Sequence, residues 1–318
     1  MGMDDDDDGE GRKDVDAASD EPAARLRFTP PTLYPIDHDA NGRVFPSRVA
    51  GYDVTVLVPQ SDTHRLEPGT GAQWIVPRSL ELTVPTAAVP DLAGSDATTL
   101  RWWQQITEWL GAWRGVAAEV DVPLERRVQP IADPATQPTT DGGAMRFYGF
   151  NSEMSATTSE FAEALRLAGK NAEMPAEYRL LVNAQVAKRD RNMRVCVIEA
   201  CAAAEVAAAA AIERSLKETY RCPEAFIQAC LRRARGLTLA TAMCVDLGLP
   251  TALDKATVDG LAKMRNTAVH AGRPMHATSA DEALATVRRM VLALSGRAVA
   301  PLSAQGESSA GEPVARPT

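Results

Sequence analysis

The chain has 318 residues, of which 45% are hydrophobic and 24% are charged, and its formal net charge at pH 7 is −8. This length allows two domains and the apolar content can fill their cores, which excludes a wholly disordered protein. The acidic balance argues against a protein that coats nucleic acid, because such proteins carry a basic face. However, ten acidic and three basic residues fall within residues 1–25, so the rest of the chain is close to neutral and has room for a local basic site.

The first 27 residues are predicted to form a disordered acidic tail. They include five consecutive aspartates, Asp4–Asp8, and few bulky apolar side chains. Such a run is typical of a solvated tail, and mimicry of nucleic acid is the less favoured alternative. The N-terminus is acidic rather than basic and then apolar, so no signal peptide is expected.

Residues 28–150 are predicted to form a small α+β module. Short segments with alternating or β-branched apolar residues indicate strands, of which the last two are weaker; these are Tyr52–Val58, Gln73–Pro77, Leu80–Val84, Arg126–Ala132 and Ala144–Phe150. Thr99–Arg114 indicates a helix whose apolar side chains recur every three or four positions. Four of the chain's five tryptophans fall in this helix, and they are interpreted as core residues in preference to a ligand-stacking platform.

No catalytic motif is recognisable in this module, and the sequence does not identify its ligand or partner. Asp37, His38 and Asp39 are residue types that bind metal ions, but nothing nearby completes a ligand set. Asn41 and Gly42 follow almost directly, so a turn is the favoured interpretation.

Residues 155–296 are predicted to be almost wholly helical. Apolar periodicity, with Pro or Gly at several of the ends, indicates the helical segments; these are Ser159–Leu167, Pro175–Ala187, Arg191–Tyr220, Pro223–Ala234, Leu237–Leu247, Ala252–Met264 and Ala283–Leu294. The longest segment is apolar nearly all round, which places it at the centre of a bundle. Residues 297–318 are rich in Ala, Ser, Pro and Gly and are predicted to be a disordered tail.

Glu199 and Glu205 interrupt the apolar surface of that longest segment. Carboxylates are rarely buried without a partner, so each is expected to meet a cation or a polar cleft. One of them is a candidate to orient Arg265, which follows later in the chain. A structural ion pair or a position at the edge of the bundle is the favoured alternative.

The longest apolar run, Ala200–Ile212, spans 13 residues and contains Glu205. A run of this length is too short to cross a membrane. The cysteines are odd in number and their spacings match no zinc or redox motif; they stand at positions 196, 201, 222, 230 and 244. We therefore expect a cytoplasmic protein with reduced, buried thiols, no membrane association, no metal site and no cofactor.

Arg265, Asn266 and His270 lie at the end of the helical segment that begins at Ala252, and Gly272 follows them. Arginine presents a rigid fork of donors that suits phosphate oxygens, and histidine exchanges protons near neutral pH. Asn266 and His270 are four residues apart and share one helix face. Arg265 points about 140° away from His270, so a second copy of the helix is needed to bring both side chains to one phosphate. A surface charge and a helix cap are the alternative interpretations of the arginine and the histidine.

The pattern Arg-Asn-x-x-x-His followed by a glycine resembles the signature of the HEPN superfamily, the higher eukaryotes and prokaryotes nucleotide-binding domains. The pattern falls on Arg265, Asn266 and His270, and the loop and closing helix after it are similar to the family's arrangement. The resemblance covers residues 155–296, about half of the chain. It implies an all-α bundle that forms a homodimer in which two such motifs face each other.

The resemblance further implies metal-independent cleavage of RNA in a defence or stress-response system, with tRNA and mRNA as candidate targets. His270 then acts as general acid or base at the 2′-hydroxyl or the leaving oxygen. Arg265 stabilises charge on the phosphate, and Asn266 hydrogen-bonds the substrate or His270. A catalytically inactive HEPN-like protein that binds nucleotide or RNA, or that serves as a dimeric scaffold, is the alternative. The RNA target, the activating trigger and any antitoxin partner are not determined by the sequence.

The basic segments nearest to the motif are candidates for an RNA-binding surface. They are Lys188–Arg194, Arg232–Arg235 and Arg288–Arg289. Convergence of these segments on Arg265 favours RNA binding, whereas their dispersal favours nucleotide binding or a purely structural dimer.

Overall fold

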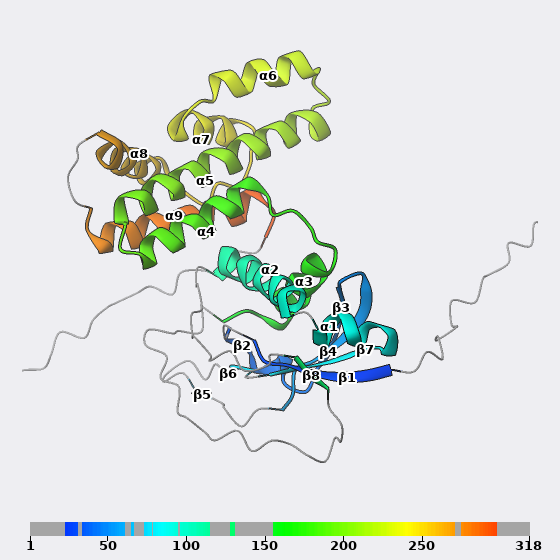
Figure 1. Ribbon diagram of the computed structural model, residues 1–318. Helices are drawn as coiled ribbons and strands as arrows, with labels where there is room; N and C mark the ends of the chain where they lie inside the picture. Colours follow the sequence, from blue (N-terminus) through cyan, green and yellow to red (C-terminus); the bar gives the residue numbers. More distant parts are fainter. Residues whose placement is uncertain are drawn as a thin grey trace, which may run out of the picture.

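The N-terminal part of the chain forms an antiparallel sheet, and a helical region follows it (Figure 1). The computed structural model describes residues 23–30, 34–60, 65–66, 73–77, 79–94, 96–114, 128–130, 155–270 and 275–297. Five strands pair in the order β3-β4-β7-β1-β8, namely β1 (Ala23–Phe28), β3 (Val44–Val49), β4 (Tyr52–Leu57), β7 (Leu80–Pro85) and β8 (Val128–Pro130). A second sheet has the order β2-β6-β5, with β2 (Ile36–Asp37), β5 (Arg65–Leu66) and β6 (Gln73–Ile75). The predicted order, a strand-containing region and then helices, is confirmed.

Strand β1 corrects the predicted extent of the acidic tail. Four of the predicted strands are present as β4, β6, β7 and β8, whereas Ala144–Phe150 lies outside the described residues. Residues 23–27 were assigned to the tail, and that prediction is wrong, because β1 pairs with both β7 and β8 and fully buries Leu26 and Phe28. Arg27 lies on the opposite face and pairs with Glu81, 54 residues further on. Two apolar residues that alternate with Arg25 and Arg27 give little local signal, and the distant strands supply the stabilisation.

Helix α2 (Asp96–Arg114) covers the sheet with its tryptophans, after a short helix α1 (Val89–Gly94). Phe28 of β1 meets the rings of Trp102 and Trp103 edge-on, with centroid distances of 6.0 Å to each. All four tryptophans of this helix are buried, so their interpretation as core residues is confirmed.

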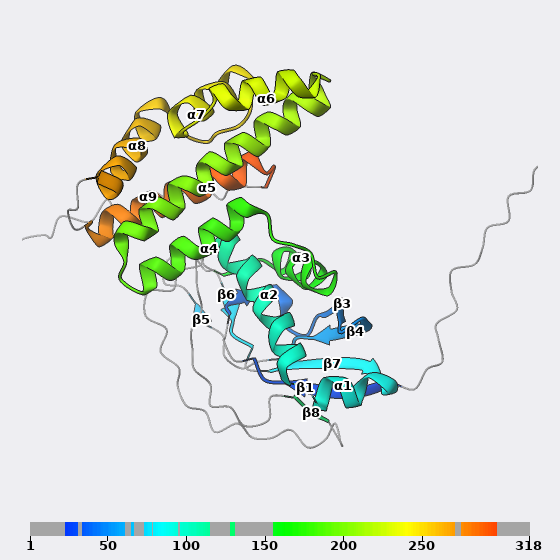
Figure 2. The same cartoon turned by 45° about the horizontal axis from the view of Figure 1, so that its top comes forward.

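Helix α3 (Thr158–Gly169) lies beside α2 and against β3, between the sheet and the rest of the helices (Figure 2). The rings of Phe161 and Phe45 meet edge-on with centroids 5.4 Å apart. The Ser47 hydroxyl donates a hydrogen bond to the Leu165 carbonyl at 2.9 Å. The first helix of the segment assigned to the bundle therefore packs on the N-terminal sheet.

Gly169→Ala is expected to destabilise the protein, because the last residue of α3 passes directly over β3. A Cβ atom there would lie 2.6 Å from the backbone nitrogen of Arg48 and 3.2 Å from its carbonyl oxygen. Backbone atoms cannot yield as a flexible side chain does, so we expect a loss of about 1–3 kcal/mol in the free energy of unfolding, measured by denaturant titration.

Gly260→Ala is the matched control, since nothing lies within 4 Å of the Cβ position of this glycine. Gly260 stands inside a helix, so the alanine is expected to stabilise the protein by up to about 1 kcal/mol. Equal effects of the two substitutions would contradict the close packing of α3 on β3.

Among the described residues, six helices form the bundle, with α5 at its centre. They are α4 (Ala176–Arg189), α5 (Met193–Arg214), α6 (Glu224–Arg233), α7 (Leu237–Asp246), α8 (Lys255–His270) and α9 (Ala277–Leu294). Helix α5 packs against α4, α7, α8 and α9, and most of its alanines are buried, which allows close approach of its neighbours. It continues into a π-helical turn, Ser215–Thr219. The predicted central position of this segment is confirmed.

Within the described part of the chain, Met193–Thr219 is the helix that is long and apolar enough to cross a membrane. It has 27 residues, and its most apolar 18-residue stretch has a mean hydropathy of 2.0. It is longer than the run Ala200–Ile212 on which the expectation from the sequence rested. In this structure 56% of that stretch is buried inside the protein, and four helices pack against α5. The bundle core accounts for its apolar composition.

The end of α2 joins the N-terminal sheet to the bundle. The Gly111 carbonyl accepts a hydrogen bond from the Gln185 amide of α4 at 2.8 Å. The Arg114 carbonyl accepts one from the Arg288 guanidinium of α9. The Arg114 guanidinium in turn pairs with Glu160 of α3 at 2.6 Å. The buried apolar core is continuous across this joint, so the bundle and the sheet pack through α2 and α3.

Candidate functional site at the end of helix α8

Helix α8 carries the Arg-Asn-x-x-x-His pattern in its last six residues. Asp254 caps its start, because the carboxylate accepts a hydrogen bond from the Thr257 amide at 2.7 Å, and that bond lowers the pKa of Asp254. Three buried residues form the inner face of the helix against α5 and α7, namely Val258, Leu261 and Ala268. The helix ends at His270, and Gly272, the predicted terminator, lies outside the described residues.

His270 and Asn266 are both exposed on the face of α8 that points away from the bundle. Four residues separate them, so an α-helix places one above the other. Lys263 and Thr267 are exposed on the same side. The imidazole is therefore accessible to a solvent-borne substrate, as an acid or base must be.

Arg265 lies on the other side of α8, toward α5. Its Nε is 3.7 Å from Oε1 of Glu205, and the two side chains are 41% and 25% exposed. The structure thus brings Arg265 to one of the two carboxylates noted in the sequence. The other, Glu199, is half-buried and forms no ion pair with the described residues. Within one chain Arg265 and His270 diverge, as their spacing predicts.

A buried thiol lies beside this ion pair. Cys201 is fully buried, and its Sγ donates to the Leu261 carbonyl at 3.8 Å. Burial raises the pKa of the Cys201 thiol to about 12; the neighbouring Glu205 also raises it, and Arg265 lowers it. The thiol is protonated at neutral pH and packs α5 against α8 rather than acting as a nucleophile.

The other cysteines only partly follow the prediction of buried thiols. Cys196 and Cys244 are buried, and burial raises the pKa of each thiol to about 11. Cys222 and Cys230 are half-buried, so the prediction is wrong for these two. Cys222 lies just before α6 and Cys230 lies within it, and only Ile227 is fully buried in that helix. All five cysteines are free.

Arg194 is the residue near the motif that no sequence pattern singled out by itself. It stands in the first turn of α5, and its Nε donates to the Ala268 carbonyl while its Nη2 donates to the Val269 carbonyl at 3.0 Å. The last carbonyls of a helix lack partners within the helix and carry partial negative charge, so a guanidinium is stabilising there. The signal available beforehand was only its membership of the basic segment Lys188–Arg194.

The three basic segments do not converge on Arg265. Arg194 reaches the end of α8, but Arg288 binds the end of α2, and Arg289 donates to the Ala252 carbonyl ahead of α8 at 3.2 Å. The arginines of Arg232–Arg235 are exposed at and just after the end of α6, which α7 separates from α8 in both views (Figures 1 and 2). One segment of the three therefore adjoins the motif, through the bonds of Arg194 to the Ala268 and Val269 carbonyls.

The Asp37-His38-Asp39 segment forms a turn, as predicted. The Asp37 carboxylate accepts the Asp39 amide at 3.2 Å and caps the short 3-10 helix His38–Ala40. Gly42 follows with a φ of +71°, a conformation that favours glycine. In the part of the chain that the structure describes, no three His, Cys, Asp or Glu side chains are grouped to hold a metal ion.

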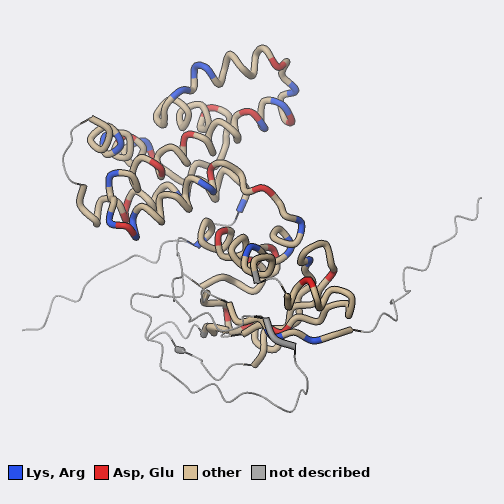
Figure 3. Tube along the Cα trace, in the orientation of Figure 1, with Lys and Arg blue, Asp and Glu red and all other residues tan. Residues whose placement is uncertain are grey.

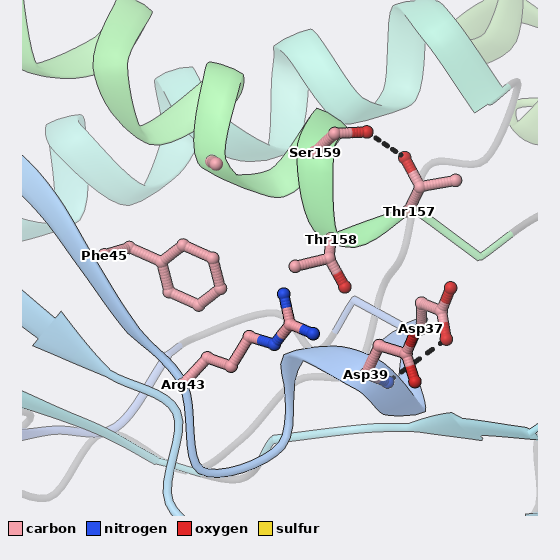
Figure 4. A pocket seen from close by; sticks show the side chains of 8 residues that line it. Asp37, Asp39, Arg43, Phe45, Thr157, Thr158 and Ser159 are labelled. Carbon is pink, nitrogen blue, oxygen red and sulfur yellow. Dashed lines mark hydrogen bonds between the residues drawn. The ribbon is translucent and has the colours of Figure 1, made fainter.

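A pocket of about 480 Å³ lies on the N-terminal module, between this turn, β3 and the start of α3 (Figure 4). Arg43, Asp37 and Asp39 point into the same space, and Phe45 forms an apolar wall. Thr158, which also lines the pocket, has a buried Oγ1 without a hydrogen-bond partner among the described residues. The pocket offers both signs of charge to a small polar ligand, and no residue of the Arg-Asn-x-x-x-His pattern lines it.

The end of α8 is the place where residues suited to chemistry meet. The His270 imidazole and the Asn266 amide are exposed there, and the Arg194 guanidinium is bound to the Ala268 and Val269 carbonyls of the same helical turn. Such a set can bind an anionic group and move a proton beside it. No family model, no curated protein and no solved structure matches this chain. The functional proposal therefore depends on the motif and on the geometry of α8.

Proposed function

We propose that the chain is a metal-independent endoribonuclease of the HEPN type. The observation that carries this proposal is the exposed face at the end of α8, where His270 and Asn266 lie together and the Arg194 guanidinium is bound to the last carbonyls of the helix. The resemblance of the pattern to the HEPN signature supplies the reaction class. RNA is then the partner, the cytoplasm the compartment, and defence or stress response the context.

The proposed reaction is an internal transfer at phosphorus. The 2′-oxygen attacks the adjacent phosphorus and the bond from phosphorus to the 5′-oxygen breaks, which leaves a 2′,3′-cyclic phosphate and a 5′-hydroxyl. His270 takes the proton of the 2′-hydroxyl or gives a proton to the leaving oxygen. Arg265 stabilises negative charge on the phosphate oxygens, and Asn266 hydrogen-bonds the substrate or holds His270.

The proposal requires a homodimer with two α8 helices apposed. Arg265 of one chain faces α5 and pairs with Glu205, about 140° around the helix from His270. The arginine and the histidine at one phosphate therefore come from different chains. The ion pair at 3.7 Å is long and partly exposed, so Arg265 can leave it for a phosphate at little cost.

Cleavage of labelled RNA in the presence of EDTA tests the reaction class. Imidazole, guanidinium and amide groups carry the proposed chemistry, so activity should survive chelation. The products should end in a 2′,3′-cyclic phosphate, identified by mass spectrometry. Loss of all cleavage in EDTA, restored by a divalent ion, would overturn this mechanism.

A catalytically inactive HEPN-like binding or scaffold protein is the second candidate. The observation that favours it is the intrachain pairing of Arg265 with Glu205, together with the dispersal of two of the three basic segments. Under this alternative the wild type dimerises and binds RNA or nucleotide, yet leaves the RNA intact. The cleavage assay therefore separates the two functions.

A further inference from the structure

We infer that the turn between α4 and α5 binds the phosphate backbone of single-stranded RNA next to His270. We name this surface the α4–α5 basic turn; it comprises Lys188, Arg189, Arg191 and Arg194. The inference rests on the proposed function, because it takes RNA as the ligand that reaches α8. It assigns the bound strand a path, from this turn onto the exposed face of the motif helix.

Arg194 fixes the position of this surface relative to the proposed active site. The guanidinium has five N–H donors, and its two hydrogen bonds to the Ala268 and Val269 carbonyls leave three for a ligand. Val269 directly precedes His270, so the guanidinium lies within roughly 6 Å of the His270 backbone. Because the side chain is anchored at two points and still exposed, it loses little freedom when it binds a phosphate.

The charge of the α4–α5 basic turn is only half matched by carboxylates. Lys188 pairs with Asp281 at 2.6 Å, and Arg189 pairs with Asp190 at 3.2 Å. Arg191 and Arg194 are exposed and form no ion pair with the described residues. These two arginines therefore present positive charge to solvent where phosphates are expected to pass.

The surface lies where α4 turns into α5, at the end of the bundle that carries the last turn of α8 (Figure 3). The other basic residues are placed differently. Arg288 and Arg289 are bound to the carbonyls of Arg114 and Ala252. Arg232 and Arg233 are exposed in the last turn of α6, beyond α7. They supply a control with the same change in charge at a different place.

Binding of a short single-stranded 2′-O-methyl RNA, followed by fluorescence anisotropy, tests the inference. This probe lacks the free 2′-hydroxyl that the proposed cleavage needs, so binding is measured apart from reaction. Arg191→Ala combined with Arg194→Ala is compared with Arg232→Ala combined with Arg233→Ala. We expect the first pair to weaken binding about 10-fold or more and to lower the slope of log Kd against log salt by about 1.4, because two phosphate contacts on a single strand are lost. The second pair should change Kd by less than about 2-fold.

Arg194→Ala removes the hydrogen bonds to the last carbonyls of α8 and could weaken RNA binding by disordering that end of the helix. Arg191→Ala alone tests for this effect, because the Arg191 side chain makes no hydrogen bond or ion pair with the described residues. Its circular dichroism should match the wild type while its binding is weakened.

Equal loss of binding in the two double variants, or no binding by the wild type, would overturn the inference. A wild type that cleaves native RNA and an α4–α5 variant that binds normally would overturn it while the proposed function stands. A wild type that binds through this turn but never cleaves would overturn the nuclease instead.

Discussion

Replacing His270 by alanine is expected to slow RNA cleavage at least about 100-fold, the usual contribution of a general acid or base. The fold should be almost unaffected, because the imidazole is exposed and makes no hydrogen bond to another described residue. We expect the free energy of unfolding to change by less than about 1 kcal/mol. Single-turnover cleavage and thermal denaturation of the same preparation measure the two quantities.

His276→Ala is the matched control for this substitution. His276 is also exposed and stands at the start of α9, where its side chain makes no capping hydrogen bond. Its replacement should leave both cleavage and stability unchanged. If His270 is instead a structural cap, the melting temperature falls and activity is lost only as the protein unfolds. A folded and fully active His270→Ala protein would refute the catalytic role.

Mixing an Arg265→Ala chain with a His270→Ala chain is expected to restore activity that neither chain has alone. If each site takes its arginine from one chain and its histidine from the other, a hybrid dimer keeps one intact site. Random mixing makes about half of the dimers hybrids, so activity should return to about a quarter of the wild-type value. The measurement is RNA cleavage after the two chains are unfolded and refolded together.

Each variant refolded alone supplies the baseline, and sedimentation at micromolar concentration establishes that both still dimerise. Arg265→Ala leaves Glu205 without its cation, but that carboxylate is 25% exposed and retains contact with water. No recovery in a mixture that contains hybrids would place both groups of a site in one chain. A wild-type monomer that cleaves RNA would exclude the composite site altogether.

Most helices of this chain were predictable because their signals are local. The spacing of the tryptophans indicated α2 and its buried face, and the all-round apolar surface of Arg191–Tyr220 indicated the centre of the bundle. Helical periodicity alone also predicted that Asn266 and His270 share a face and that Arg265 diverges from it. Each of these properties depends on residues within a few turns of one another.

The strands were less predictable, because a strand is stabilised by its partners. β1 has two inward apolar residues, Leu26 and Phe28, that alternate with Arg25 and Arg27, and the strand exists because β7 and β8 pair with it. The same limit applies to α3, which was assigned to the bundle by its position in the sequence. Phe161 and Gly169 dock it on β3 instead, through contacts to residues more than 100 positions away.

The surroundings of the motif were decided by tertiary packing. The helix that ends in Arg265, Asn266 and His270 follows from neighbouring residues, since backbone hydrogen bonds link positions four apart. Arg194 lies 74 residues from the carbonyl that it binds, and Glu205 belongs to a different helix from Arg265. No periodicity connects such residues, because their contact depends on how α5 and α8 cross. The motif is therefore a property of the chain, whereas the charge around it is a property of the fold.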